Sequence, residues 1–133
     1  MVKPYEEEQS KRLNERESTT LLTIFFRYIQ DTYKQFKWQA SYGLYSVTGY
    51  GKGYTTADIT EKHGQVFYKT GSIFFYVDMR EEGIVEVRSV LQKGGRGEVG
   101  KTQKFPISGK SPNELGKLAR IMFKWAKERM DEL

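Results

Sequence analysis

The spacing of large apolar residues changes twice along this chain, and these changes limit the folds that it can adopt. After Ser18, apolar residues recur every three or four positions from Leu22 to Phe36, as on one face of an α-helix. From Phe36 the interval shortens to two, which is the period of a half-buried β-strand. Helical spacing returns after Ser111. The sequence therefore predicts an α+β fold, in which a long N-terminal helix and a C-terminal helix flank an antiparallel β-meander.

The middle of the chain divides into short strands with glycines at the joints. The segment Ile73–Val77 has large side chains for both faces, which predicts a central strand. Val85 and Val87 alternate with Glu86 and Arg88, so we expect the two valines to point into the core. The expected strands run over residues 36–42, 44–50, 54–59, 66–69, 72–80, 84–91 and 101–107.

Both helices carry capping signals at their expected starts. Ser18 or Thr19 is a suitable N-cap for the first helix. Ser111 and Glu114 form a capping box around Pro112, because the hydroxyl and the carboxylate can bind N–H groups that have no partner within the helix. We therefore expect the second helix to begin at Pro112.

A length of 133 residues fits one domain. Residues 1–17 are polar and densely charged, so we expect a flexible lead-in followed by a single domain over residues 18–133. The absence of cysteine excludes a disulfide framework, a thiolate nucleophile and cysteine-bound zinc. We expect a cytoplasmic protein without a membrane partner, because the sequence contains neither a signal-peptide core nor a long apolar run.

Aromatic and basic residues gather in the middle of the chain. The 22 basic and 17 acidic residues give a net charge of +5, but many of the acids lie near the two ends. Between Thr32 and Ala57 there are seven large aromatic residues and three lysines, and no carboxylate. A second stretch, Arg88–Lys110, has six basic residues and the single acid Glu98. Rings that stack on bases, beside cations that neutralise phosphates, are typical of single-stranded nucleic-acid surfaces.

Part of the aromatic content is needed for the core. We expect the core rings to be Phe25, Phe26, Phe36, Trp38, Phe75 and Trp125. The rings left as candidates for base stacking are Tyr42, Tyr45, Tyr50, Tyr54, Tyr68, Phe74 and Tyr76. The alternative is that these rings form a second buried face, covered by a helix or by a partner chain.

Residues Gly95–Thr102 match the phosphate-binding loop of nucleotide hydrolases. That motif requires a helix directly after the loop, so that N–H groups point at the phosphates. Here Pro106 and Gly109 follow in a segment that alternates like a strand. We therefore interpret Gly94–Lys101 as a basic hairpin loop.

Asp78, Glu86 and Arg88 suggest a metal-dependent nuclease as an enzyme alternative. Two carboxylates can hold a metal, and a cation can stabilise charge that develops at phosphorus. Charged residues on an exposed strand face are more often cross-strand pairs. His63, the only histidine, lies in an expected turn without a nucleophilic partner.

The segment Tyr76–Arg88 resembles a strand, turn and strand of the positive-cofactor-type transcriptional coactivators, a family of single-stranded DNA-binding proteins. The basic loop that follows, a strand at Lys104–Ser108 and a helix opening at Pro112–Glu114 extend the resemblance over the second half of the chain. The resemblance implies a curved antiparallel sheet backed by a helix, and a homodimer that holds unpaired bases. It also implies basic contacts, at Arg80, Arg88, Lys101 and Lys104.

The leading hypothesis is a non-enzymatic, largely sequence-independent single-stranded nucleic-acid-binding protein, with DNA favoured over RNA. No cofactor, metal or catalytic residue is expected. A structural or assembly protein, for instance of a viral particle, is the alternative, and a nuclease is the second alternative. The predicted binding residues are Lys37, Tyr42, Tyr45, Tyr50, Lys52, Tyr54, Tyr76, Arg80, Arg88, Lys93, Arg96, Lys101 and Lys104.

Overall fold

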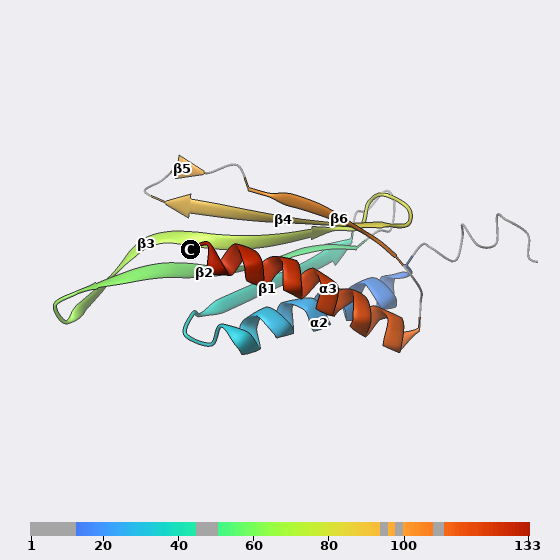
Figure 1. The fold of residues 1–133 in the computed structure, drawn as a ribbon, viewed down its shortest axis with the longest axis horizontal. Coiled ribbons are helices and arrows are strands. Elements are labelled where there is room, and N and C mark those ends of the chain that lie inside the picture. Colours follow the sequence, from blue (N-terminus) through green and yellow to red (C-terminus); the bar gives the residue numbers. More distant parts are fainter. Residues whose placement is uncertain (1–12, 45–50, 94–95, 98–99, 108–110) are drawn as a thin grey trace, which may run out of the picture.

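The computed structural model describes residues 13–44, 51–93, 96–97, 100–107 and 111–133. These residues form an α+β fold with the predicted order of helix, antiparallel strands and helix (Figure 1). The elements are α2 (Glu15–Thr32), β1 (Trp38–Leu44), β2 (Gly51–His63), β3 (Val66–Asp78), β4 (Ile84–Lys93), β5 (Arg96–Gly97), β6 (Thr102–Pro106) and α3 (Pro112–Asp131).

Helix α2 begins at Glu15, before the predicted start, because its cap is Asn14. The Asn14 side-chain oxygen accepts a hydrogen bond from the Glu17 N–H (2.9 Å), and the Glu17 carboxylate accepts one from the Asn14 N–H (3.2 Å). This reciprocal pair satisfies two N–H groups at the helix start. The prediction that Ser18 or Thr19 caps the helix was wrong, since Ser18 is buried within it. The Ser111 cap predicted for α3 is confirmed, because its hydroxyl accepts from the Glu114 N–H at 3.2 Å, but the reciprocal half of the predicted capping box is not formed and the Glu114 carboxylate lies 3.6 Å from the Lys117 ammonium.

The strands form one antiparallel sheet in the order β1-β2-β3-β4-β5, and β6 pairs with the other end of β4. Strand β3 lies between β2 and β4, which confirms the predicted central strand. The segments expected at 66–69 and 72–80 are joined in this one strand. The strand expected at 36–42 is found at Trp38–Leu44, and most of the one expected at 44–50 lies outside the described residues.

The β2–β3 hairpin is longer than the rest of the sheet. A bulge between Ile59 and Thr60 shifts its register, so that Ile59 pairs with Gly71 and Thr60 with Lys69. The hairpin turns at Gly64, whose φ of 65° is a conformation that glycine adopts without strain. Beyond the bulge, the tip of the hairpin extends past the helices and the other strands (Figure 1).

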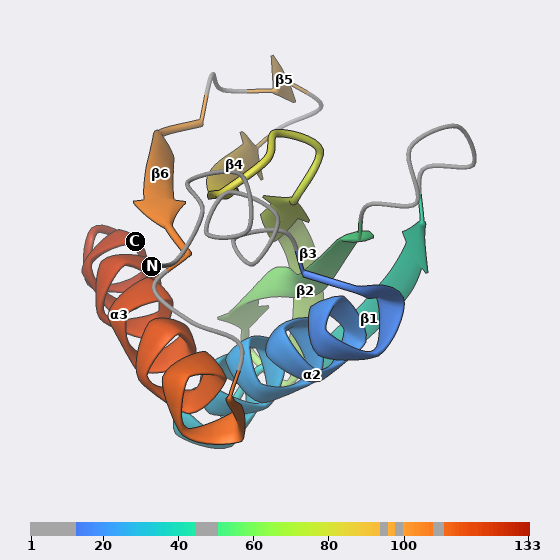
Figure 2. The same cartoon turned by 90° about the vertical axis from the view of Figure 1, so that its right-hand side faces the viewer.

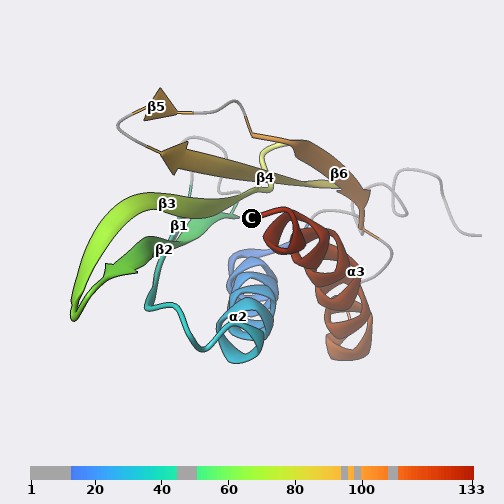
Figure 3. The same ribbon diagram turned by 60° about the vertical axis from the view of Figure 1, so that its left-hand side comes forward.

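Helices α2 and α3 lie side by side against one face of the sheet (Figures 2 and 3). The alternation of strand side chains supplies the sheet half of this core, and the helical stripes supply the other half. Val85 and Val87 are fully buried, as predicted. The largest fully buried core side chains are Leu21, Leu22, Phe25, Phe26, Ile29, Phe75, Val77, Val85, Val87 and Met122.

Candidate nucleic-acid interface

The face of the sheet that points away from α2 and α3 is here called the open face. Successive strand residues point to opposite faces, and Thr55, Phe75 and Val85 are fully buried on the helix side. Their neighbours therefore point to the other side, which no described helix covers (Figure 3). The open face carries Lys52, Tyr54 and Thr56 of β2, Phe74, Tyr76 and Asp78 of β3, Glu86, Arg88 and Val90 of β4, and Thr102 and Lys104 of β6.

Three aromatic side chains, Tyr54, Phe74 and Tyr76, form a ring cluster on the open face. The rings of Phe74 and Tyr76 are stacked, with centroids 5.6 Å apart and an interplanar angle of 11°. The Tyr54 ring centroid lies 5.7 Å from that of Tyr76 and 6.3 Å from that of Phe74. Tyr54 is 37% exposed and the other two side chains are half-buried. Part of this aromatic surface is therefore accessible to a flat ligand.

A cation lies directly beside the ring cluster. Arg88 is the register partner of Tyr76, and its guanidinium carbon lies 5.2 Å from the centroid of the Tyr76 ring. The same register continues in both directions as a ring row across the sheet: Ser41, Tyr54, Tyr76, Arg88 and Thr102. Arg88 forms no ion pair with any other residue in the described parts of the chain. Its charge is therefore not neutralised by a neighbouring carboxylate.

A second row, here called the charged row, runs parallel to the ring row, and each of its residues lies two positions from a ring-row residue on the same strand. In register order it consists of Lys52, Asp78, Glu86 and Lys104. The two acids lie directly opposite each other on neighbouring strands, an arrangement that destabilises a sheet. The Asp78 carboxylate accepts a hydrogen bond from the Arg80 N–H (2.9 Å). The Lys104 ammonium is 3.2 Å from the carboxylate of Glu81 rather than paired with its register partner Glu86.

The two rows border a hollow of about 440 Å³ on the open face. This volume lies in the range of small-ligand sites in proteins. The hollow combines aromatic surface, cations and carboxylates within one concave region. Its side-chain lining includes Lys52, Tyr54, Tyr76, Asp78, Arg80, Glu86 and Arg88.

Several residues that the sequence analysis singled out meet at this hollow. They come from segments far apart in the sequence, and the sheet register brings them together. Lys104 lies on the same face, at the end of the charged row. The predicted binding residues that line the hollow are Tyr42, Lys52, Tyr54, Tyr76, Arg80 and Arg88.

The other predicted binding residues lie elsewhere or are not described. Tyr42 borders the hollow, but its ring packs on the helix side, 5.7 Å from the ring of Phe26. Lys37 is exposed between α2 and β1, and Lys93 is exposed at the end of β4. Tyr45, Tyr50 and the side chain of Arg96 lie outside the described residues.

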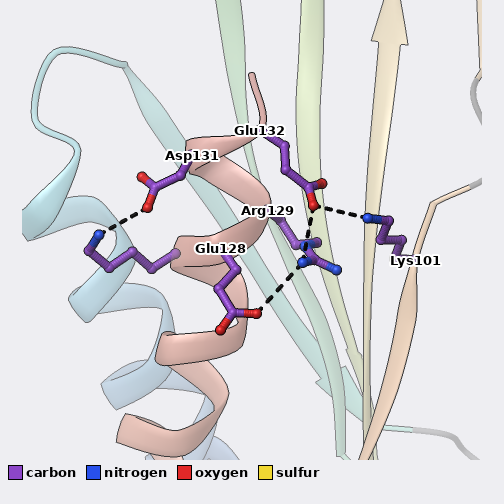
Figure 4. Close-up of polar contacts among 6 residues, drawn as sticks. Lys101, Glu128, Arg129, Asp131 and Glu132 are labelled. Carbon is purple, nitrogen blue, oxygen red and sulfur yellow. Dashed lines mark hydrogen bonds and ion pairs between the residues drawn. The ribbon is translucent and has the colours of Figure 1, made fainter.

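Lys101 is engaged at the end of α3 rather than at the hollow (Figure 4). Its ammonium is 2.9 Å from the carboxylate of Glu132, which also lies 3.2 Å from the guanidinium of Arg129. The hydrogen bond from Lys101 and the charge of Arg129 lower the pKa of the Glu132 carboxyl. This network ties the segment before β6 to the C-terminal turn of α3.

The site prediction left out two residues that the structure brings to the hollow's surroundings. Phe74 was named only among the candidate rings, and Glu86 only in the nuclease alternative. Phe74 lies two residues from Tyr76 on β3 and Glu86 lies two residues from Arg88 on β4, so alternation alone places each on the same face as a predicted binding residue of its own strand. The missing information was the register between strands, because two turns and a bulge separate these residues in the sequence.

A second aromatic group lies on the hairpin arm, here defined as residues 60–69 of the β2–β3 hairpin. All of these residues are exposed, and Val66, Phe67 and Tyr68 are 53%, 65% and 53% exposed. The Lys62 ammonium lies 5.6 Å from the centroid of the Phe67 ring, and the rings of His63 and Tyr68 are 5.6 Å apart. Lys69 pairs with Asp58 (2.9 Å) at the base of the arm.

The remaining motifs have structural explanations. The residues after the phosphate-loop match form strand β6 and not a helix, as predicted, but Arg96 and Gly97 within the expected loop form the short strand β5. Within the described ranges, no group of three or more histidine, aspartate or glutamate side chains is placed to hold a metal ion. Neither described helix is long and apolar enough to cross a bilayer.

Comparison with known proteins adds no identification. No family model, no curated protein sequence and no solved structure matches this chain.

Proposed function

We propose that this protein binds single-stranded nucleic acid, DNA before RNA, on the open face of its sheet. The observation that carries the proposal is the ring cluster of Tyr54, Phe74 and Tyr76, with the Arg88 guanidinium over the ring of Tyr76. Bases of a single strand are unpaired, so they can stack on such rings whatever their sequence. A duplex offers no comparable ring surface, because its bases are already stacked on each other.

Cations around the hollow supply the phosphate contacts. Lys52 and Arg80 line it together with Arg88, and Lys104 lies on the same face. Lysine and arginine side chains release counterions from the strand when they neutralise its phosphates. Binding is therefore expected to weaken with salt, by about 0.7 log unit per log unit of salt for each phosphate neutralised.

A fluorescence anisotropy titration with a labelled oligothymidylate and a duplex of the same length tests the proposal, at two salt concentrations. We expect the single strand to bind more tightly than the duplex, and its affinity to fall at the higher salt. A strand that does not bind at low salt, or a duplex that binds more tightly, would overturn the proposal.

The hairpin arm favours a second candidate function, the assembly of this chain with copies of itself. Val66 and Tyr68 expose apolar surface on one side of the arm, and Phe67 exposes it on the other, at the far end of the molecule. Exposed apolar patches of this kind are typical of protein contacts. Sedimentation velocity of the wild type and of Phe67→Ser tests this role. A homodimer that the substitution dissociates would support it, and a wild-type monomer at all concentrations would exclude it.

A further inference from the structure

The hollow contains a carboxylate that its neighbours leave without a partner. Glu86 is half-buried, and within the described residues it forms no hydrogen bond or ion pair. Its register partner on β6, Lys104, binds Glu81 instead (3.2 Å). The cation two residues along β4, Arg88, lies over the ring of Tyr76. Glu86 is therefore an available acceptor in a site that otherwise suits an anionic strand.

The position of Glu86 is costly for the fold alone. It lies directly opposite Asp78, and like charges in register destabilise a sheet. Asp78 is held by the N–H of Arg80 (2.9 Å), whereas Glu86 has no such hydrogen bond among the described residues. A charged side chain that opposes a like charge and has no compensating contact of its own among the described residues, as Glu86 has none, is typical of functional sites.

The register fixes what Glu86 can contact. Tyr54 and Tyr76 are direct partners in the ring row, and Glu86 lies in the adjacent charged row of the same hollow. A base stacked on the ring cluster therefore presents one edge toward the charged row. A carboxylate only accepts hydrogen bonds, so it selects an edge that donates them.

The four bases differ in what their Watson–Crick edges offer to a carboxylate. Guanine presents two adjacent donors, its ring N1–H and its 2-amino group, which match the two oxygens of Glu86. Adenine and cytosine present one amino group beside a ring nitrogen that is an acceptor, and thymine and uracil present one N–H between two carbonyl oxygens. Proteins that read single-stranded RNA stack its bases and bind their Watson–Crick edges by hydrogen bonds, and the same chemistry is open to a base at this site.

We propose that Glu86 gives this site a preference for guanine at the base that stacks on Tyr54 and Tyr76. This inference rests on the proposed function and makes it more specific. Single-strand binding remains possible with any base, and guanine adds a bidentate contact to the stacking. A good bidentate contact to a base favours it by about 5- to 150-fold, and we expect the lower end at a site open to water.

The test uses labelled oligothymidylates that carry one central guanine, hypoxanthine or adenine, with the all-thymine strand as reference. Anisotropy titrations measure each affinity for the wild-type protein. We expect guanine to bind at least about fivefold more tightly than thymine. Hypoxanthine, which retains N1–H but lacks the 2-amino group, should fall between the two.

Two variants separate recognition from charge. Glu86→Gln should bind all strands with similar affinity, because the amide no longer accepts two donors. Glu82→Gln removes the same charge from the exposed β3–β4 turn and should retain the preference. Thermal unfolding of each variant checks that the fold is intact.

The outcomes distinguish this inference from the proposed function. If the all-thymine strand binds and guanine gives no gain, or if Glu86→Gln retains the gain, the guanine preference is wrong while single-strand binding stands. If no strand binds, the proposed function itself fails. Competition by guanosine monophosphate, with thymidine monophosphate as control, identifies the source of the base. If guanosine monophosphate selectively displaces the labelled strand, the guanine preference extends to a free nucleotide. If neither nucleotide displaces the strand, a guanine preference seen in the titrations belongs to strands alone.

Discussion

The two ends of the β2–β3 hairpin use the same strands in different ways. At the hairpin root, which pairs residues 52–58 with residues 72–78, the strands have neighbours on both sides and helices on one face. Beyond the bulge at Ile59 and Thr60, the two strands of the hairpin arm pair only with each other in the part of the chain that the structure describes, and every arm residue is exposed. Both ends carry aromatic side chains, but only the root holds them within a wide sheet.

This difference separates ordered from unsupported aromatic surface. At the root, Phe74 and Tyr76 stack at 11° beside Tyr54, and the sheet fixes their spacing before any ligand arrives. At the arm, Phe67 is 65% exposed and contacts one flexible lysine side chain, Lys62. Preorganised groups lose less conformational entropy when they bind. The root is therefore the better platform for bases, and the arm is better suited to contact another chain.

The largest expected difference between root and arm is in stability. Phe75 is fully buried at the root, on the helix side of β3. Phe75→Ala removes that packing and should lower the free energy of unfolding by about 3–5 kcal/mol. Phe67→Ala in the exposed arm should change it by less than about 0.5 kcal/mol. Urea unfolding followed by circular dichroism measures the free energy of unfolding of both variants. Similar losses of stability in the two variants would contradict the difference between a packed root and an unsupported arm.

The sequence predicted the division of the sheet into faces better than the division of the hairpin into root and arm. Phe75 was expected in the core and Phe74 and Tyr76 outside it, and the alternation of a strand separates them in this way because its period depends only on neighbouring residues. The bulge that separates root from arm could not be read in this way. It depends on which residues pair across the hairpin, and both strands are rich in residues that favour β structure.

The candidate site was predictable in its residue types but not in its arrangement. Tyr54, Tyr76 and Arg88 were expected to bind, and they share one row of the sheet. Tyr42 was expected to join them, yet its ring lies against Phe26 on the helix side. Alternation places Tyr42 on the same face of β1 as Trp38, which was expected in the core, but composition alone could not decide which face a helix would cover.

The second prediction compares one ring from the root with one from the arm in binding. Tyr76→Ala removes the centre of the ring row and should weaken oligothymidylate binding by about 1–3 kcal/mol, the usual value of a stacked base. Tyr68→Ala in the arm should leave the affinity within about twofold of the wild type, because an unstacked ring contributes nothing to it. Anisotropy titrations at low salt measure both variants.

Tyr76→Leu serves as a control for this comparison, because leucine keeps much of the apolar bulk without a flat ring. It should bind as weakly as Tyr76→Ala while its thermal unfolding stays closer to that of the wild type. If Tyr76→Ala and Tyr68→Ala lost equal affinity for oligothymidylate, the arm would also belong to the nucleic-acid interface.

The third prediction compares a cation at each end. Arg88 has no ion-pair partner among the described residues, whereas Lys69 is 2.9 Å from the carboxylate of Asp58. If Arg88 neutralises one phosphate, Arg88→Gln should reduce the slope of log affinity against log salt by about 0.7. Lys69→Gln should leave the slope unchanged. Titrations over a series of salt concentrations give both slopes. If only Lys69→Gln changed the slope, the phosphate contact would belong to the arm and not to the root.

The smallest expected effect lies at the joint between root and arm, where Asp58 contacts Lys69 and accepts a hydrogen bond from the Ser72 hydroxyl (3.2 Å). The hydrogen bond from Lys69 lowers the pKa of the Asp58 carboxyl below its ordinary value of 3.8. A carboxyl whose pKa is lower in the folded state than in the unfolded state stabilises the fold at pH values above its unfolded-state pKa. This stabilisation is lost as the pH falls through the folded-state pKa. Both side chains are more than half exposed, so water screens the pair, and Asp58→Asn should cost about 0.5 kcal/mol or less at pH 7. The difference in free energy of unfolding between Asp58→Asn and the wild type should vanish well below pH 3.8.

A double-mutant cycle with Lys69→Gln, measured by urea unfolding at pH 7 and at a pH well below 3.8, isolates the contribution of the Asp58–Lys69 pair. A coupling that persists at the lower pH would show that the joint is held by something other than this ion pair.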